Sequence, residues 1–535
     1  MKKTVYILIA LVTAGLVSSC DDRLDVSNPN LQSSGDFWQT EDQIAEGVIG
    51  IYNRLLTDGA FGRMTPSLLD LRGDDTWSES PWTVYPLTGD FTIWSSYDVL
   101  TWPWREYFIM VFRSNLMIEK AAGVEFENPD HGDRLVGQSY FLRAFTYYLL
   151  TENYERVPLI LEVQRNADQY YPHTTSRDSI LDQIEADLQT AMGLLPESYN
   201  AVNGPDQGQL GRATWGSAAG LLAKVYMIRE KWTEAAQLLN EIITSGIYDL
   251  VDDYGENFTY DNENNVESLF EIQFGNYGTD DNWWNISTAN WRQAHALGFN
   301  YGLIEFGAWG DVKPTQWLYD QFKIERTAGG TLDPRLYWTL VSYELEYDGY
   351  TDGRTNTVFG ASPYTDGTYP KLNGDSIFIA KYTYARIPGH TQEQDGQMLN
   401  NIINYRFMRY AEILLLYAEA LCELDRHAEA VPFINRIRER ADLSLLEAGT
   451  MTDEQIWDEL HHQRVLELSI EGVRHIDIKR WGWFYDADKL AELQMHDDEF
   501  ETWRPGHEYL PIPSTELDQN PNLDGNSANE SAATE

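Results

Sequence analysis

Cysteine is almost absent from this chain, which has only two, Cys20 and Cys422, among 535 residues. Basic residues are also scarce, with 39 lysines and arginines against 84 aspartates and glutamates. The formal net charge of −45 argues against binding to nucleic acid or to an anionic membrane surface, because such a charge repels both. Beyond the extreme N-terminus no apolar run is long enough to cross a membrane.

The motifs of common catalytic sites are missing as well. The chain has no HExxH, no GxSxG, no P-loop and no GxGxxG that opens a helix. A glycoside hydrolase is the enzymatic alternative, but among 84 carboxylates some close acidic pair is inevitable and none stands out. Cys422 lies inside the apolar run 413–424 and is expected to be a buried small hydrophobe. We therefore expect no enzyme, no cofactor and no metal site.

The N-terminus has the features of a cleaved export signal. Two lysines precede a mostly apolar run at residues 5–17, which is shorter than the ~20 residues of a membrane span. The following sequence VSSC, which ends at Cys20, resembles a lipoprotein signal-peptidase site. We predict that residues 1–19 are removed and that Cys20 carries a lipid anchor; a plain secretory signal with an incidental cysteine is the alternative. The mature chain would have a net charge of −47 and no internal disulfide.

The remaining chain has enough apolar (43%) and aromatic (13%) residues to build a core. Helical periodicity predicts helices at residues 41–56, 104–122, 133–151, 176–195, 212–245, 405–442 and 453–481. The amino-acid composition changes between residues 251 and 400, where 16 of the 39 glycines lie. Long loops and a few short strands are expected in that region.

Two helical stretches, 212–247 and 409–443, look like copies of one another. Each places a small residue twelve positions before another, Ala223 before Ala235 and Ala418 before Ala430. Small residues at this spacing are typical of tetratricopeptide helix pairs, in which they let two antiparallel helices approach. A coincidental helical hairpin is the alternative. A degenerate third copy begins at residues 141–147, with its second helix displaced by the insertion 157–175.

Several motifs follow one another along the chain: residues 20–26 (CDDRLDV), 138–144 (QSYFLRA), 156–159 (RVPL), 409–420 (RYAEILLLYAEA), 464–474 (RVLELSIEGVR), 509–513 (YLPIP) and 520–523 (NPNL). Taken in order, they are similar to those of the SusD/RagB family of nutrient-binding surface lipoproteins. The set spans the whole mature chain. One departure is Gln463, where the family usually has glutamate, so that a local salt bridge is expected to be missing.

The resemblance implies a mainly α SusD-like fold with tetratricopeptide-like helix pairs and a loop-rich ligand-binding portion. It implies a helical scaffold at about 36–250 and 401–485, a loop-rich insertion at about 251–400 and an extended C-terminal segment at 486–535. It also implies a SusC-like TonB-dependent transporter as partner, on which the protein acts as a lid. The outer membrane is the implied location, and Asp21 and Asp22 resemble a signal for export to its outer face.

Eighteen tryptophans are present, and they are unevenly distributed. One group lies in a polar segment with no clear periodicity, and a second lies in the loop-rich insertion. An exposed ring offers a flat platform for a sugar ring, whose hydroxyls need acids and amides as partners. The candidate ligand-binding residues are Asp74, Asp75, Trp77, Trp82, Tyr85, Trp94, Trp283, Trp284 and Trp309.

The sequence therefore favours a lipoprotein that captures oligosaccharide or polysaccharide. Capture of peptide or another nutrient in the same type of complex is one alternative, because some relatives do not handle glycans. An interaction scaffold without a ligand is the other, because tetratricopeptide-like helices commonly bind protein partners.

Replacement of Trp283 and Trp284 together by alanine tests the second tryptophan group. We expect ligand binding to be lost while the thermal unfolding temperature stays nearly unchanged, because exposed rings add little to the core. A large fall in the unfolding temperature would assign both residues to the core instead.

Overall fold

The computed structural model describes residues 37–277, 293–302, 308–342, 377–387 and 401–532. Cys20, Trp283 and Trp284 lie outside these residues. Within the described part of the chain, no helix combines the length and the apolar character needed to cross a membrane.

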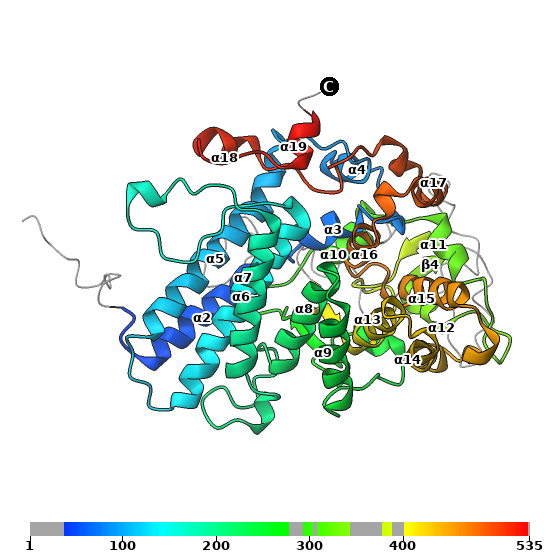
Figure 1. Cartoon of the computed structure of the whole chain (residues 1–535), viewed down its shortest axis with the longest axis horizontal. Helices are drawn as coiled ribbons and strands as arrows, with labels where there is room; N and C mark the ends of the chain where they lie inside the picture. The colour runs from blue at the N-terminus through cyan, green and yellow to red at the C-terminus, as the bar shows by residue number, and fades with distance from the viewer. Residues whose placement is uncertain (1–36, 278–292, 303–307, 343–376, 388–400, 533–535) are drawn as a thin grey trace, which may run out of the picture.

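Helices dominate the described residues, and the strands are few and short (Figure 1). The helices are α2 (Glu41–Leu55), α3 (Met64–Asp70), α4 (Val84–Gly89), α5 (Thr101–Ala121), α6 (Pro129–Tyr154), α7 (Arg177–Leu194), α8 (Trp215–Ile228), α9 (Trp232–Thr244), α10 (Leu297–Tyr301), α11 (Gln316–Gln321), α12 (Pro334–Thr339), α13 (Tyr410–Glu423), α14 (His427–Arg440), α15 (Asp453–Leu468), α16 (Arg474–Arg480), α17 (Ala487–His496), α18 (Ser514–Gln519) and α19 (Ser527–Ala532). The strands are β1 (Thr76–Trp77), β2 (Ser268–Ile272), β3 (Lys313–Pro314), β4 (Leu340–Ser342), β5 (Ile377–Ile379) and β6 (Tyr405–Arg409). They pair antiparallel as β1 with β3, β2 with β6 and β4 with β5.

The long helices form one continuous array. Helix α2 packs on α5, α5 on α6, α6 on α7, α7 on α8 and α8 on α9. Helix α9 in turn packs on α13, so the array continues into α14 and α15 although more than 150 residues separate α9 from α13 in sequence. Figure 1 shows this progression from blue and cyan helices on one side to yellow and orange helices on the other. The mainly helical fold expected from the sequence is confirmed.

The helical hairpins predicted from the small-residue spacing are present. Helices α8 and α9 pair with each other, as do α13 and α14, and the four alanines that defined the pattern are all fully buried. The degenerate copy corresponds to α6 and α7, which pack closely across the insertion that separates them.

Two regions differ from the prediction. Residues 405–409 form strand β6 instead of the start of a helix, because they pair with β2 and are buried along their whole length. Residues 486–532, expected to be extended, contain the short helices α17, α18 and α19. Polar residues that favour helix starts, such as the N-cap Asp486, explain the helical turns in this segment.

Local capping sets where several long helices begin. Thr40 and Thr452 form capping boxes with Gln43 and Gln455 at the starts of α2 and α15. Asn128 caps α6 and is followed by proline at the first helical position, where the missing N–H costs nothing.

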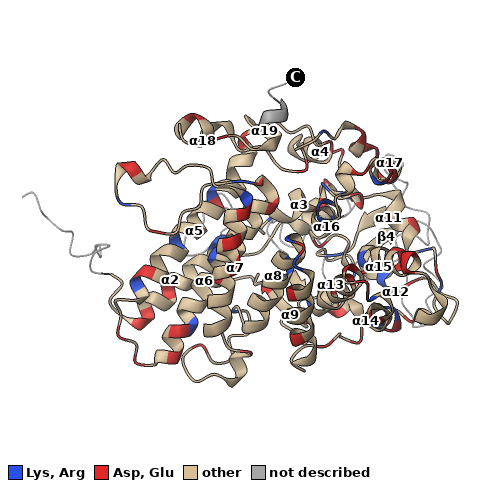
Figure 2. Ribbon diagram, in the orientation of Figure 1, with Lys and Arg blue, Asp and Glu red and all other residues tan. Residues whose placement is uncertain are grey.

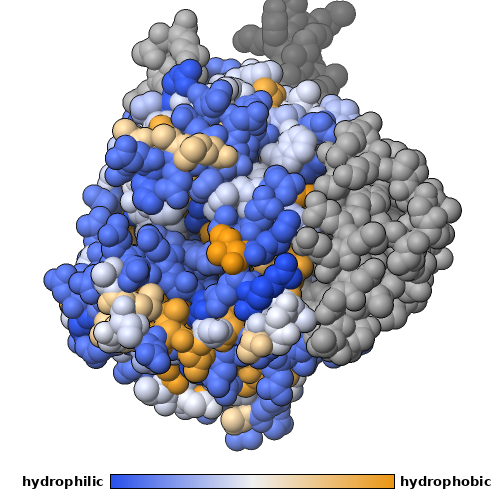
Figure 3. All heavy atoms as spheres, turned by 90° about the vertical axis from the view of Figure 1, so that its right-hand side faces the viewer, coloured by the Kyte–Doolittle hydropathy of each residue, from blue (hydrophilic) through white to orange (hydrophobic). Residues whose placement is uncertain are grey.

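Most of the apolar side chains belong to one large core that runs through the helical array. A smaller cluster under the C-terminal segment contains Phe91, Ile478, Trp483, Phe484, Leu493, Phe500 and Trp503. Cys422 is buried and unpaired, and burial raises the pKa of its thiol to about 12, as suits an inert core residue. Figure 2 marks acidic and basic positions along most of the helices, and the face drawn in Figure 3 is mainly hydrophilic.

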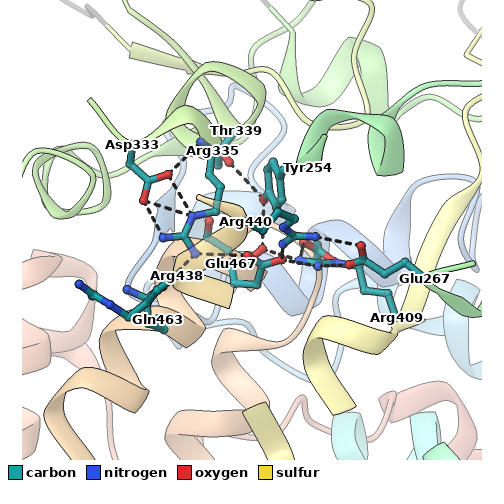
Figure 4. A network of polar contacts seen from close by, with 12 residues as sticks. Tyr254, Glu267, Asp333, Arg335, Thr339, Arg409, Arg438, Arg440, Gln463 and Glu467 are labelled. Carbon is teal, nitrogen blue, oxygen red and sulfur yellow. Dashed lines mark hydrogen bonds and ion pairs between the residues drawn. The ribbon is translucent and has the colours of Figure 1, made fainter. Parts of the chain in front are cut away.

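A network of buried charges joins the loop-rich region to the helical array (Figure 4). Arg409, at the junction of β6 and α13, binds Glu267 and Glu471 at 2.8 Å each and also contacts Glu467 of α15. Arg440, at the end of α14, binds the same Glu267 at 2.9 Å and also contacts Glu467. Every one of these side chains is at least 95% buried.

Three further residues extend the network into the loop-rich region. Arg335 of α12 binds Asp333 at 2.6 Å and Glu467 at 3.2 Å, and Lys381 binds Glu471 at 2.8 Å. The network thus contains four cations and four carboxylates, so its formal charge is zero. Burial alone would raise the pKa of Glu467, but Arg440, Arg409 and Arg335 hold it far below its usual range.

Gln463 lies at the edge of this network. Its side-chain oxygen accepts a hydrogen bond from Arg335 at 3.0 Å, and its amide nitrogen donates to Glu459 at 2.9 Å. A glutamate here would form an ion pair with Arg335; the glutamine forms neutral hydrogen bonds instead. Its amide accepts from Arg335 and donates to Glu459 at the same time.

Replacement of Arg409 by methionine tests the network. We expect a loss of about 3–5 kcal/mol in the free energy of unfolding, because the change removes a buried cation that three buried carboxylates share and leaves the network with an uncompensated negative charge. Urea unfolding followed by circular dichroism measures the loss.

The matched control is Arg426→Met, which removes an exposed i,i+3 pair with Glu429. Such a surface pair contributes about 0–1 kcal/mol. Equal effects of the two substitutions would contradict a dominant role for the buried network.

Candidate functional site

The first tryptophan group lies on the segment 74–85, which connects α3 to α4. Strand β1 at residues 76–77 pairs with β3 of the loop-rich region. The Ser78 hydroxyl donates to the Asp311 carbonyl at 2.6 Å, and the Ser80 hydroxyl donates to the Asp311 carboxylate at 2.6 Å. The segment is therefore built onto the residues around Asp311, although more than 230 positions separate the two in sequence.

Trp82 is held between a cation and other rings. The guanidinium carbon of Arg63 lies 4.4 Å from the centre of the Trp82 ring, and Arg63 is itself fixed by two hydrogen bonds to Asp58 of 2.6–2.7 Å. Trp102 and Tyr85 lie 6.0 and 5.0 Å from the same ring, between centroids. Trp82 and Trp102 both remain partly exposed, so these rings present a fixed apolar face to solvent.

Trp77 and Trp94 lie to either side of Trp82 along the segment. The Trp77 indole donates to the Pro314 carbonyl at 3.2 Å, and the Lys313 ammonium lies 5.1 Å from its ring centre. Trp94 is 49% exposed and contacts Tyr97 edge-on at 5.7 Å. We refer to Trp77, Trp82, Trp94, Tyr97 and Trp102 as the aromatic surface.

Three of the candidate residues are buried beneath this surface. Asp74 accepts two hydrogen bonds from Arg474, at 2.5 and 2.8 Å, and one from His496 at 2.7 Å. Burial alone would raise the pKa of Asp74, but these two partners lower it to about 2. Tyr85 is fully buried and its hydroxyl accepts from Asn300 at 2.7 Å.

Asp75 is also fully buried, but its carboxyl group has fewer hydrogen-bond partners than that of Asp74. One carboxyl oxygen accepts the Ile470 N–H at 3.2 Å, while the other has no hydrogen-bond partner. Burial and the neighbouring carboxylates of Asp70 and Asp74 raise the pKa of Asp75 to about 8. Asp74, Asp75 and Tyr85, which were candidates for ligand contact, are thus buried and support the segment from inside the protein.

Trp309 is the one member of the second tryptophan group that lies within the described residues. It is partly buried and packs on Phe299 with 5.3 Å between ring centres. The chain continues from Trp309 to Asp311 and Lys313, which contact the segment of Trp77 and Ser80. The loop-rich region and the N-terminal segment therefore meet. Trp283 and Trp284 fall outside the described residues.

Sequence reasoning missed Arg63, Tyr97 and Lys313. Arg63 contacts Trp82 and Lys313 contacts Trp77, and neither pair is close in sequence. No local sequence pattern therefore predicts these contacts. Trp102, on helix α5, is partly exposed and contacts Trp82. Contacts of this kind depend on tertiary structure alone.

The chemistry of this arrangement is that of a binding site. It offers several ring faces with charged and hydroxyl groups between them, which is the composition of a site for a ring-shaped polar ligand. Among the described residues, no group of three or more histidine, cysteine, aspartate or glutamate side chains is placed to hold a metal ion.

Comparison with known proteins identifies the family. A model of the SusD family matches residues 266–528, and a model described as "starch-binding associating with outer membrane" matches residues 22–227. Together these two matches cover most of the chain. The chain belongs to the SusD/RagB family, whose members are non-catalytic binding proteins, and the expectation of a binding protein is confirmed.

Individual relatives agree with this assignment. A SusD-like protein (P2) of Formosa agariphila is 27% identical, with 97% of this chain and 98% of the relative covered. A crystal structure of a SusD superfamily protein from Bacteroides vulgatus is 25% identical, with a TM-score of 0.76 and coverage of 92% and 100%. Surface glycan-binding protein A from Bacteroides thetaiotaomicron, solved in complex with laminarihexaose, is 22% identical, with a TM-score of 0.72 and coverage of 91% and 100%.

Replacement of Asp75 by asparagine tests the internal role of this residue. The pKa of Asp75 is about 8 in the folded protein and about 4 in the unfolded chain. The folded state therefore holds the proton more tightly, which stabilises the protein fully below about pH 4. This stabilisation is lost as the pH rises toward 8. The neutral amide does not titrate, so we expect the variant to unfold about 3 °C above the wild type at pH 9. The difference should shrink toward pH 5, as followed by circular dichroism.

The control is Asp425→Asn, at an exposed position with φ of 58°, which asparagine also tolerates. This variant should unfold with the wild type at both pH values. A lower unfolding temperature of Asp75→Asn at pH 9 would show that the charged carboxylate is needed at this position.

Proposed function

We propose that this protein is a lipoprotein of the cell surface that captures oligosaccharide or polysaccharide. The observation that carries the proposal is the aromatic surface, whose partly exposed rings are held by contacts from three separate parts of the chain. Trp77, Trp82, Trp94 and Trp309 are the proposed ligand contacts among the described residues, with Trp283 and Trp284 as further candidates. The laminarihexaose bound to the related glycan-binding protein supports a glycan as ligand.

The proposal includes the route by which the glycan enters the cell. The Cys20 lipid would anchor the protein in the outer membrane, which agrees with the description of the N-terminal family model. A SusC-like TonB-dependent transporter is the proposed partner, and this protein would deliver glycan to it as a lid. Purification of the full-length lipidated chain from its native membrane should recover such a transporter with it.

Affinity electrophoresis tests glycan capture. Soluble protein that begins after Cys20 is run through native gels that contain starch, laminarin, xylan or pectin, and the same mixtures are assayed for reducing ends. We expect at least one polymer to retard the protein without release of reducing ends. The double variant Trp82→Ala with Trp94→Ala should bind about tenfold or more weakly, because each removes a ring platform.

The control is Trp232→Ala, at the start of α9 and outside the aromatic surface. It should be retarded as the wild type is. Release of reducing ends would establish a hydrolase instead. If none of the four polymers retards the wild type, capture of peptide or another nutrient becomes the better explanation.

A further inference from the structure

Helix α5 carries a row of side chains that continues the aromatic surface. Trp102, Arg105, Ile109 and Phe112 are three, four and three positions apart, which places them along one side of the helix. The row is about 15 Å long at 1.5 Å per residue. Phe112, at the far end, is 47% exposed, which is unusual for a large apolar ring on a helix that otherwise packs into the core.

The far end of this row opens into a pocket of about 430 Å³ between three parts of the chain that are remote in sequence. Helix α5 provides one wall with Arg105, Phe108 and Phe112. The insertion after α6 provides the second with Tyr170 and Tyr171, and the third comes from α18 and the residues that follow it. Figure 1 shows α18 above the loop that follows α6, near α5.

The walls of the pocket are tied together by hydrogen bonds that do not involve the exposed rings. The Asn520 side chain donates to the Pro172 carbonyl at 2.8 Å, and the Asn522 side chain donates to the Tyr171 carbonyl at 2.7 Å. Tyr170 and Tyr171 are nevertheless 54% and 48% exposed. The backbone of the insertion is thus held in place while its two rings face solvent, an arrangement that costs a bound ligand little ordering of the site.

The lining indicates what kind of ligand fits. Two tyrosines and two phenylalanines supply ring faces, Gln164, Gln519 and Asn520 supply amides, and Arg105 and Glu516 supply one charge of each sign. The volume lies within the range of about 300–1,000 Å³ that is usual for small-molecule sites, whereas a protein partner needs about 800 Å² of surface on each side. Ring faces with amides between them and no net charge match a neutral sugar.

We propose that this pocket is a second glycan subsite, which binds a neutral sugar unit of the same polymer that contacts the aromatic surface. The inference rests on the proposed function. The row on α5 connects the two sites, because Trp102 belongs to the aromatic surface and Phe112 to the pocket. A long polymer would occupy both at once, so the second site raises the affinity for polymer through the high effective concentration of the tethered chain.

The double variant Tyr170→Ala with Tyr171→Ala tests the subsite in the same starch, laminarin, xylan and pectin gels. Dissociation constants are taken from the retardation as a function of polymer concentration. We expect about a tenfold weaker affinity for the polymer that retards the wild type, with an unchanged thermal unfolding temperature, because both rings are exposed. The control is Tyr485→Ala, which removes a 64% exposed tyrosine outside the pocket and should bind as the wild type does.

The possible outcomes separate this inference from the proposed function. If a polymer retards the wild type and the double variant equally, the second subsite is overturned while glycan capture stands. If the variant binds polymer normally but no longer recovers a transporter from the membrane, the pocket is a protein interface and the inference is overturned. If none of the four polymers retards the wild type, both proposals fail together.

Discussion

The buried network of charges around Glu467 joins the helical array to the loop-rich region. Arg409 and Arg440 come from the helical array, while Glu267, Asp333, Arg335 and Lys381 come from the loop-rich region. Charges in such an environment are strongly unfavourable unless each has its partner, so the network forms as a whole or is costly to the fold. Its geometry fixes where the loop-rich region lies on the helical array.

The same principle operates directly beneath the site. Asp74 and Arg474 form a buried ion pair under the segment that carries Trp77 and Trp82, and the partly buried His496 ring is hydrogen-bonded to the same carboxylate. The rings above are therefore presented on irregular backbone that is nonetheless rigidly supported. Loop segments of this kind commonly carry the residues that bind ligands, while the elements they connect supply the scaffold. The segment has few backbone hydrogen bonds of its own, and buried side-chain contacts such as Asp74 with Arg474 hold it in place instead.

The sequence predicted the helices well, because their periodicity and caps are local properties. It also indicated the helix pairs, since small residues at the contact positions of α8, α9, α13 and α14 leave a clear spacing. It did not show that Asp74 and Asp75 point inward, because an acidic, aperiodic segment is equally consistent with exposure. Strand β6 was missed for a related reason: its pairing with β2 depends on residues more than 130 positions away. The contact of Arg63 with Trp82 likewise has no local signature.

The support of the aromatic surface also has a consequence for how the chain is made. The Ser78 N–H donates a hydrogen bond to the Glu499 carboxylate, and Asp74 is paired with Arg474. The two partners in these contacts are 421 and 400 residues apart in sequence. The chain leaves the ribosome N-terminus first, so the tryptophan segment is made long before these partners exist. It lacks their support until nearly the whole chain has been synthesised. The aromatic surface is therefore completed late in folding, and a nascent or C-terminally shortened chain would carry its rings without the contacts that hold them.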